Sequence, residues 1–253
     1  MDLGDFFTRH PKAALGLSGG ADSAYLLYAG LSLGADLRPY FVSSAFQPEF
    51  ELEDARRLCG ELGAELSVIS LDVLAEPLVA ANPADRCYHC KRLIFSALRD
   101  RALADGYGLL LDGTNASDQV DDRPGMRALE ELRVLSPLRL CGITKAELRR
   151  RSREAGLFTW DKPAYACLAT RVPTGEEISP GKLRRIDGAE TELFRMGFTD
   201  LRVRLDGSAA RLQFNRSQLP AAAETEFKSA SLMGLSRYAT APSCTASFAY
   251  ENS

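Results

Sequence analysis

The first half of the chain alternates short apolar runs with amphipathic stretches, and this alternation limits the possible folds more than any other feature. The apolar runs cover residues 12–18, 37–46, 65–74 and 106–115. Helix-like stretches separate them, and the clearest of these ends at Gly63. Strands separated by helices of this length are typical of βαβ units, whose parallel strands are covered by helices. We therefore expect an α/β fold in which a parallel sheet has helices on both faces.

Beyond Gly142 the alternation gives way to a different pattern. A helix-like stretch, a proline-rich segment and a second helix-like stretch precede two alternating runs around Gly207 and Ser208, which predict a β-hairpin. The last segment is rich in Ser, Ala and Thr, has weak periodicity and is assigned no structure. We expect a large α/β domain, a smaller α+β domain and an atypical tail, covering residues 1–142, 143–220 and 221–253.

Composition and charge narrow the class of protein. Hydrophobic residues make up 45% of the chain, as in globular proteins, and the net charge of −3 is unlike the basic footprint of proteins that grip long nucleic acids. The sequence shows no signal-peptide pattern and no apolar run as long as a membrane span. We therefore expect a cytoplasmic protein without a membrane or nucleic-acid partner. In a reducing compartment, its six cysteines favour metal binding or catalysis over disulfides.

The stretch SGGADS lies between the first predicted strand and the first predicted helix. Its glycines, Gly19 and Gly20, let the backbone approach a ligand, and N–H groups at a helix N-terminus attract anions. Ser18 and Ser23 add hydroxyl donors, and Asp22 is placed to order a metal ion or to cap the helix. The Gly-Lys-Ser/Thr ending of a Walker A loop is absent. A tight capped turn is the simpler alternative, but the complete motif after an apolar run favours a phosphate site.

Three cysteines form a second candidate site. Cys87 and Cys90 are spaced Cys-x-x-Cys at the predicted start of a helix, and Cys167 lies in the stretch AYACLATR. Thiolate is the form of cysteine that binds iron or attacks an electrophile. Three thiolates leave one coordination position open, whereas a structural zinc site normally has four protein ligands. The structural alternatives are burial of the pair as small hydrophobes and loop packing of Cys167.

The motif SGGADS resembles the signature of the PP-loop ATP pyrophosphatases. These enzymes cleave ATP between its α and β phosphates, adenylate an oxygen of a substrate and then displace AMP with a nucleophile. Five further blocks together resemble the LarE family: NPADRCYHCK, DGTNASDQVDDRPGMRAL, SPLRLCGITKAELR, KPAYACLATRVPTGEEI and GFTDLRVRLDGSAARL. The resemblance extends from about Lys12 to about Phe214.

This resemblance implies a fold, a reaction and a set of cofactors. The fold is an N-terminal PP-loop domain followed by a smaller sulfur-transfer domain. The reaction is ATP-dependent sulfur insertion into pyridinium-3,5-biscarboxylic acid mononucleotide, whose carboxylates become thiocarboxylates on the path to the nickel-pincer nucleotide. ATP and Mg²⁺ are implied as cofactors, a small nucleotide as the substrate, and a homo-oligomer as the assembly.

LarE proteins are of two kinds, which differ in their cysteines. One kind sacrifices the sulfur of a single cysteine, which aligns with Cys167, and is left with dehydroalanine. The other kind has three cysteines that hold a [4Fe-4S] cluster. The presence of Cys87, Cys90 and Cys167 resembles the second kind, and it implies an external sulfide or sulfur donor as a partner.

The resemblance also assigns residues to the nucleotide and to the substrate. Gly113, Thr114 and Asn115 follow the fourth predicted strand, at the same sheet edge as SGGADS, and are assigned to ATP. Substrate contacts are assigned to Arg171, Arg202, Arg204, Asp122 and Arg123. Arg202 and Arg204 lie two positions apart on a predicted strand, so they share a face that suits a phosphate. The alternative for these two arginines is a solvated strand face. The alternative for Asp122 and Arg123 is a turn with a surface ion pair.

Three other interpretations stay open. In the first interpretation, the protein catalyses the same reaction and Cys167 is the sacrificial sulfur donor. The second is a tRNA-thiolating PP-loop enzyme, against which the acidic overall charge counts. The third is a module that binds ATP or a metal and passes sulfur or metal to a partner without catalysis.

Overall fold

The structure is a computed structural model that describes residues 1–118, 124–207 and 209–224. Asp122 and Arg123, two of the predicted substrate contacts, lie outside the described residues, as does most of the predicted tail. Within the described ranges, no helix is both long enough and apolar enough to cross a membrane.

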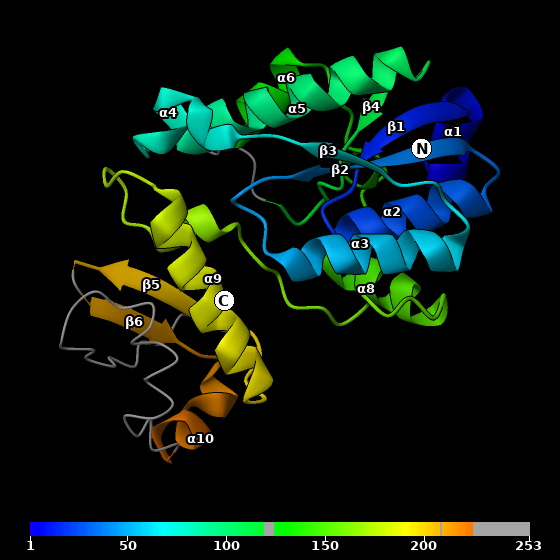
Figure 1. The fold of residues 1–253 in the computed structure, drawn as a ribbon. Coiled ribbons are helices and arrows are strands. Elements are labelled where there is room, and N and C mark those ends of the chain that lie inside the picture. The colour runs from blue at the N-terminus through cyan, green and yellow to red at the C-terminus, as the bar shows by residue number, and fades with distance from the viewer. Residues whose placement is uncertain (119–123, 208, 225–253) are drawn as a thin grey trace. The chain divides into compact units, whose positions relative to one another are not determined.

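The chain forms two compact units (Figure 1). Among the described residues, those within Met1–Val79 and Asp85–Ala164 form the first unit, and those within Ala80–Ala84 and from Tyr165 onward form the second. The first unit extends past residue 142, where we expected a boundary, because the next helix packs on its core.

A parallel sheet of four strands forms the centre of the first unit. The strands are β1 (Lys12–Gly16), β2 (Asp36–Ser43), β3 (Ser67–Ser70) and β4 (Leu110–Leu111), and their order across the sheet is β3-β2-β1-β4. All three strand pairs are parallel. The expected α/β fold with a parallel sheet is therefore confirmed.

Helices cover both faces of this sheet (Figure 1). One face carries α2 (Ala21–Ser32), α3 (Glu49–Leu62) and α8 (Lys145–Glu154), and the other carries α5 (Arg86–Ala104) and α6 (Pro124–Glu131). The shorter elements of this half of the chain are α1 (Leu3–Arg9), η1 (Val73–Ala75), α4 (Pro77–Ala80) and α7 (Pro137–Leu140).

The alternation of side chains along the strands builds a core on each face of the sheet. Leu15 and Phe41 belong to the cluster packed against α2 and α3, whereas Ala14, Tyr40 and Val42 belong to the cluster packed against α5. Because successive strand residues point to opposite faces, strands covered on both sides must be apolar at nearly every position. This requirement accounts for the continuous apolar runs in the sequence.

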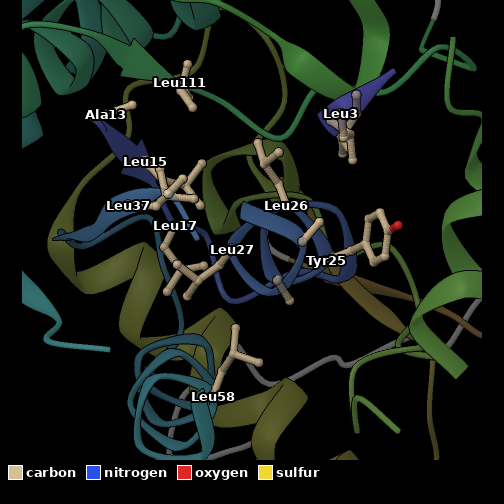
Figure 2. Packing of buried hydrophobic residues seen from close by; sticks show 14 of the residues in the cluster. Leu3, Ala13, Leu15, Leu17, Tyr25, Leu26, Leu27, Leu37, Leu58 and Leu111 are labelled. Atoms are coloured by element: carbon tan, nitrogen blue, oxygen red, sulfur yellow. The ribbon is translucent and has the colours of Figure 1, made fainter. Parts of the chain in front are cut away.

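Figure 2 shows the larger of these two clusters. Leu15 and Leu17, at the end of β1, lie near Leu26 and Leu27 of α2, and Leu58 approaches from α3. All five side chains are almost completely buried. The first turn of α2 is therefore fixed against the end of β1, which positions the loop between them.

Capping residues set the ends of the helices in this unit. Gly63 has a φ of +66° and ends α3 in the left-handed conformation that glycine favours. The hydroxyl of Thr144 accepts a hydrogen bond from the backbone N–H of Glu147, a contact typical of N-cap residues, and so caps α8. Gly156, with a φ of +70°, follows the end of α8.

The second unit is a smaller α+β arrangement. It contains η2 (Leu168–Arg171), α9 (Pro180–Arg195), the antiparallel hairpin of β5 (Arg202–Asp206) and β6 (Ala209–Gln213), η3 (Arg216–Gln218) and α10 (Leu219–Glu224). The predicted hairpin is confirmed. Its core includes Leu193 of α9, Val203 and Leu212 of the hairpin, and Phe198 and Phe214 next to them.

A short segment from the middle of the chain completes the second unit. Asn82 is 1% exposed, has a φ of +54°, and donates from Nδ2 to the carbonyls of Val172 at 3.3 Å and Pro173 at 2.8 Å. Its own carbonyl accepts from the N–H of Gly175 at 2.8 Å. Asparagine tolerates the left-handed conformation and supplies amide donors, so it suits this position.

Candidate active site

The adjacent strands β1 and β4 define the sheet edge where the candidate site lies. β1 leads into α2 on one face, whereas β4 follows α5 on the other face, so the chain connections diverge between these two strands. Ligands of open α/β sheets bind at such a point, outside the carboxyl ends of the strands. The loops that leave β1 and β4 here contain the residues predicted to bind ATP.

The loop after β1 is held in shape by its own polar groups. Ser23 is buried, and its Oγ accepts from the N–H of Ser18 at 3.1 Å and lies 3.1 Å from the Oγ of Ser18. The N–H of Gly20 donates to that Ser18 oxygen at 3.3 Å. Gly19 has a φ of +74°, and a Cβ there would lie 2.4 Å from the carbonyl oxygen of Glu51. Only glycine fits at this position.

Asp22 joins this loop to two other elements. The Nζ of Lys145, the first residue of α8, lies 2.7 and 2.8 Å from the two carboxylate oxygens. Asn115 Nδ2 donates to the same carboxylate at 3.3 Å. The charged donor Lys145 and the neutral donor Asn115 therefore orient the carboxylate of Asp22, which does not cap α2. Lys145 was not predicted, because no spacing in the sequence links residues so far apart.

The loop after β4 packs directly on the start of α2. A Cβ on Gly113 would lie 2.8 Å from the backbone nitrogen of Ser23, so the two segments touch backbone to backbone. The largely buried Asp112 accepts from the hydroxyls of Thr114 at 2.5 Å and Ser136 at 2.6 Å. These contacts fix the loop that carries the predicted nucleotide residues.

The two loops open into one cavity of about 530 Å³, large enough for a small-molecule ligand. Ser18, Asp22, Ser23, Gly113 and Thr114, five of the predicted ATP residues, line it. Its other lining residues come mainly from α5, from the β4 loop and from α6: Gly16, Cys87, Lys91, Phe95, Asp112, Asp118, Pro124, Gly125 and Met126. The lining of the cavity thus includes both charged or polar residues and apolar ones such as Phe95 and Met126.

Cys87 is brought to this cavity by the first turn of α5. Its side chain is exposed, and Cys90 lies one turn further along the same helix and is partly buried. Arg86 Nη2 lies 3.5 Å from the Cys87 sulfur. His89 Nε2 lies 3.3 Å from Oδ2 of Asp85, one turn earlier on the chain. The structural alternative, in which both cysteines are buried as small hydrophobic residues, does not hold for Cys87, because its side chain is exposed.

Cys167 lies in the second unit, immediately before η2. Its carbonyl accepts from the N–H and the hydroxyl of Thr170, at 3.0 and 2.9 Å, and its side chain is partly exposed. Arg171 Nη1 donates to the carbonyl of Ala166 and to the hydroxyl of Thr170, both at 2.9 Å. Arg171 therefore braces the backbone on both sides of the thiol.

Arg171 was predicted to contact the substrate, but it is 1% exposed and pairs with the fully buried Glu190. Burial acts to lower the pKa of Arg171, but the hydrogen bonds and charge of Glu190 raise it overall. The pKa of Tyr165 is raised by burial and by the same carboxylate, which accepts its hydroxyl proton in a hydrogen bond. The side chain of Arg171 is occupied inside the protein, so its place in the structure suits support of the Cys167 loop.

Arg202 and Arg204 share one face of β5, and Val203 between them is buried in the core. Arg204 donates from Nε to Gln213 at 2.6 Å and from Nη1 to the carbonyl of Thr170 at 3.0 Å. The predicted common face is therefore present, and Arg204 also fastens the hairpin to the loop beyond Cys167.

The remaining described cysteines have structural positions. Cys59 is buried in the core of the first unit, and burial raises its pKa to about 11. Cys141 is partly buried, and burial raises its pKa as well. Cys244 lies outside the described residues. Within the part of the chain that the structure describes, no three His, Cys, Asp or Glu side chains gather into a metal site.

The fold and the loop after β1 define the class of this protein, which is a PP-loop α/β protein. Over 210 residues the chain is 30% identical to the pyridinium-3,5-bisthiocarboxylic acid mononucleotide synthase of Lactiplantibacillus plantarum, a match that covers 82% of this chain and 76% of the synthase. The chain belongs to the LarE family, of which that synthase is a member.

The chain is also similar to other proteins. An uncharacterized protein of Synechocystis sp. is 39% identical over 221 residues, which cover 86% of this chain and 82% of that protein. A tRNA-specific 2-thiouridylase of Frankia alni is 29% identical over 182 residues, which cover 58% of this chain and 52% of the thiouridylase. No protein-family model matches the chain. The names of the synthase and the thiouridylase both describe enzymes that form sulfur-containing products, which supports an enzyme of that broad kind.

Proposed function

We propose that this protein is a cytoplasmic ATP-dependent sulfurtransferase that acts on pyridinium-3,5-biscarboxylic acid mononucleotide. It adenylates the carboxylates of that substrate and converts them to thiocarboxylates, and it releases pyrophosphate and AMP. The observation that carries the proposal is that residues of the SGGADS loop, residues of the β4 loop and Cys87 all line one cavity at the β1–β4 edge. ATP and a sulfur-handling group would meet there.

The reaction has two steps, activation of the carboxylate and transfer of sulfur. A carboxylate oxygen of the substrate attacks the α-phosphorus of ATP, and pyrophosphate leaves with the electron pair of the broken P–O bond. A sulfur nucleophile then attacks the activated acyl carbon, and AMP leaves with the acyl oxygen. Ser18 and Ser23 would donate to the phosphates, and Asp22 would hold Mg²⁺, which takes carboxylate ligands. Preorganised donors of this kind stabilise the charge that develops during transfer.

Cys87, Cys90 and Cys167 are the residues that would hold a [4Fe-4S] cluster. The donor set fits, because such clusters are bound by cysteine thiolates, and all three cysteines are at least partly exposed. The two cysteines of α5 are three positions apart, which places them on one face of the helix. When bound, the cluster would supply the sulfur for transfer. Consumption of the sulfur of Cys167 is the competing source.

The second candidate function is tRNA thiolation, and the thiouridylase relatives favour it. The named thiouridylase match covers little more than half of each chain, whereas the synthase match covers most of both. A protein that thiolates tRNA would bind it with an affinity that falls steeply as salt rises. The net charge of −3 argues for the smaller substrate.

Pyrophosphate release tests the proposed activation step. The protein is incubated with ATP, Mg²⁺ and the biscarboxylic acid mononucleotide, and pyrophosphate is measured for the wild type and for Asp22→Asn. We expect release that requires the mononucleotide and that falls on the order of 100-fold in the variant. Asp36→Asn, at the opposite end of the sheet beside Lys12, is the control and should retain wild-type release. Release that is stimulated by tRNA alone would support the second candidate.

A further inference from the structure

Lys162 contacts the SGGADS loop, although it is not among the described residues that line the cavity. Its Nζ donates to the carbonyl of Gly19 at 2.8 Å and lies 2.5 Å from Oδ2 of Asp54 on α3. The ring of Phe50, on the same helix, has its centroid 5.1 Å from the ammonium group. The side chain of Lys162 is only 16% exposed, so the charge is largely shielded from water and is held by protein groups.

The carbonyl that Lys162 binds belongs to the peptide group between Gly19 and Gly20. The described chain has no cis peptide bond, and in a trans peptide the carbonyl and the N–H point in opposite directions. The N–H of Gly20 donates to the Oγ of Ser18, which lines the cavity. Lys162 therefore holds the carbonyl on one side, and the N–H is turned towards the other side, where the cavity residue lies.

This peptide group has little stiffness of its own. Glycine on both sides leaves many backbone conformations accessible, so rotation of the peptide is easy unless another group holds it. A stiffer residue at the first position is excluded, because its Cβ would lie 2.4 Å from the carbonyl oxygen of Glu51. A rotated peptide would direct a carbonyl oxygen at the phosphates and repel them, whereas an N–H attracts them. Within the loop, the hydrogen bond to Ser18 restrains the N–H side of this peptide, and Lys162 restrains its carbonyl side from outside the loop.

We infer that Lys162 is a positioning residue that fixes the Gly19–Gly20 peptide so that its N–H faces the bound triphosphate. Asp54 in turn holds Lys162, and a hydrogen bond to a charged group is stronger than a neutral one. The inference rests on the proposed binding of ATP in the cavity. It gives Lys162 an indirect role, because its ammonium group acts on the loop and not on the nucleotide.

The competing role is a direct contact between Lys162 and a phosphate. Substitution of Asp54 distinguishes the two roles. If Lys162 acts through the loop, loss of Asp54 loosens it and weakens ATP binding. If Lys162 instead moves to a phosphate, loss of Asp54 releases it and leaves ATP binding equal or tighter.

The test is calorimetric binding of α,β-methylene-ATP and of adenosine to the full chain. In Lys162→Met we expect the affinity for the ATP analogue to fall at least about tenfold, or about 1.4 kcal/mol, with no change for adenosine. Asp54→Asn should weaken the analogue in the same direction, and Lys162→Arg, which keeps a charged donor, should restore most of the loss. Lys12→Met, at the opposite end of β1, is the matched control.

Three results would overturn the inference, and they differ from one another. Wild-type affinity in Lys162→Met would remove any role for this residue. Weak binding in Lys162→Met together with unchanged or tighter binding in Asp54→Asn would show a direct phosphate contact. Absence of binding to the wild type would contradict the proposed function itself. Thermal unfolding of each variant separates loss of affinity from loss of fold, and Asp54→Asn serves if Lys162→Met does not fold.

Discussion

Arg171 and Glu190 form a two-point ion pair inside the second unit, with Nε to Oε1 at 2.9 Å and Nη2 to Oε2 at 3.3 Å. Both side chains are completely buried. The carboxylate also accepts from the N–H of Val203 at 2.8 Å and from the hydroxyl of Tyr165. One buried carboxylate thus ties α9, the hairpin and the Cys167 loop together.

Removal of Glu190 should therefore destabilise the second unit. Glu190→Ala leaves a buried guanidinium without its partner, and such losses cost about 3–5 kcal/mol. Urea unfolding followed by a probe in the second unit measures the change. Glu154→Ala, whose carboxylate pairs with Arg150 on the exposed face of α8, is the control and should change stability by less than about 1 kcal/mol. Equal effects of the two variants would contradict this account of the pair.

Substitution of Gly113 should disturb the ATP site through the backbone. In Gly113→Ala the new Cβ meets the nitrogen of Ser23 at 2.8 Å, and overpacking of this kind costs about 1–3 kcal/mol. We expect weaker binding of α,β-methylene-ATP. Gly60→Ala, on the exposed side of α3 with nothing within 4 Å, should keep that affinity and stabilise the helix by about 0.5–1 kcal/mol. If Gly113→Ala bound the analogue with unchanged affinity, the β4 loop would not take part in nucleotide binding.

Alkylation should distinguish Cys87 from Cys59. Cys87 is exposed and lines the cavity, so iodoacetamide at about pH 8 should label it quickly, and α,β-methylene-ATP should slow that labelling. Cys59 should stay unlabelled in the folded protein, because burial raises its pKa from 9.0 to about 11 and keeps the thiol protonated. Peptide mass spectrometry reads both sites. Labelling of Cys87 at the same rate with and without the nucleotide would count against a shared cavity.

The same shift gives Cys59 a contribution to the pH dependence of stability. The folded state keeps the thiol proton to higher pH than the unfolded state does. The stabilising contribution is therefore fully present below about pH 9 and is lost as the pH rises towards about 11. In Cys59→Ala, the fall in unfolding free energy over this interval should be smaller than in the wild type. An identical pH profile would contradict the assignment to this thiol.

Iron content should decide between the two sulfur sources. Protein purified without oxygen should carry about four irons per chain with acid-labile sulfide, and both should be lost in Cys87→Ala and in Cys167→Ala. Cys141→Ala, outside the three-thiol set, is the control and should keep them. A protein without iron that converts Cys167 to dehydroalanine during turnover would replace the cluster by the sacrificial route.

The parts of the fold that were predictable are those set by local chemistry. The continuous apolar run around Ala14 and Leu15 indicated a strand buried on both faces, and the structure places these residues in different core clusters. Thr144 caps its helix because a hydroxyl satisfies an N–H in the first turn. The SGGADS motif predicted a loop at the end of a strand, and the structure places its polar side chains at one cavity.

The parts that were not predictable depend on contacts between distant segments. Asp22 and Lys145 lie on different helices, and neither has a local signal for the other. Asn82 is buried in the second unit, and no neighbouring residue in the sequence marks it as buried. Arg171 looked like an anion ligand because its charge was visible and its partner Glu190 was not. Burial decides such roles, and the sequence pattern does not reveal the burial of a single charged residue.

The measurement that tests the central claim most directly is mass spectrometry of the mononucleotide product. Pyridinium-3,5-biscarboxylic acid mononucleotide is incubated with the anaerobically purified protein, ATP, Mg²⁺ and sulfide, and AMP and pyrophosphate are quantified in the same samples. The account predicts a product in which sulfur replaces a carboxylate oxygen, with one AMP and one pyrophosphate formed for each replacement. An unchanged mononucleotide, or sulfur incorporation without ATP cleavage, would contradict it.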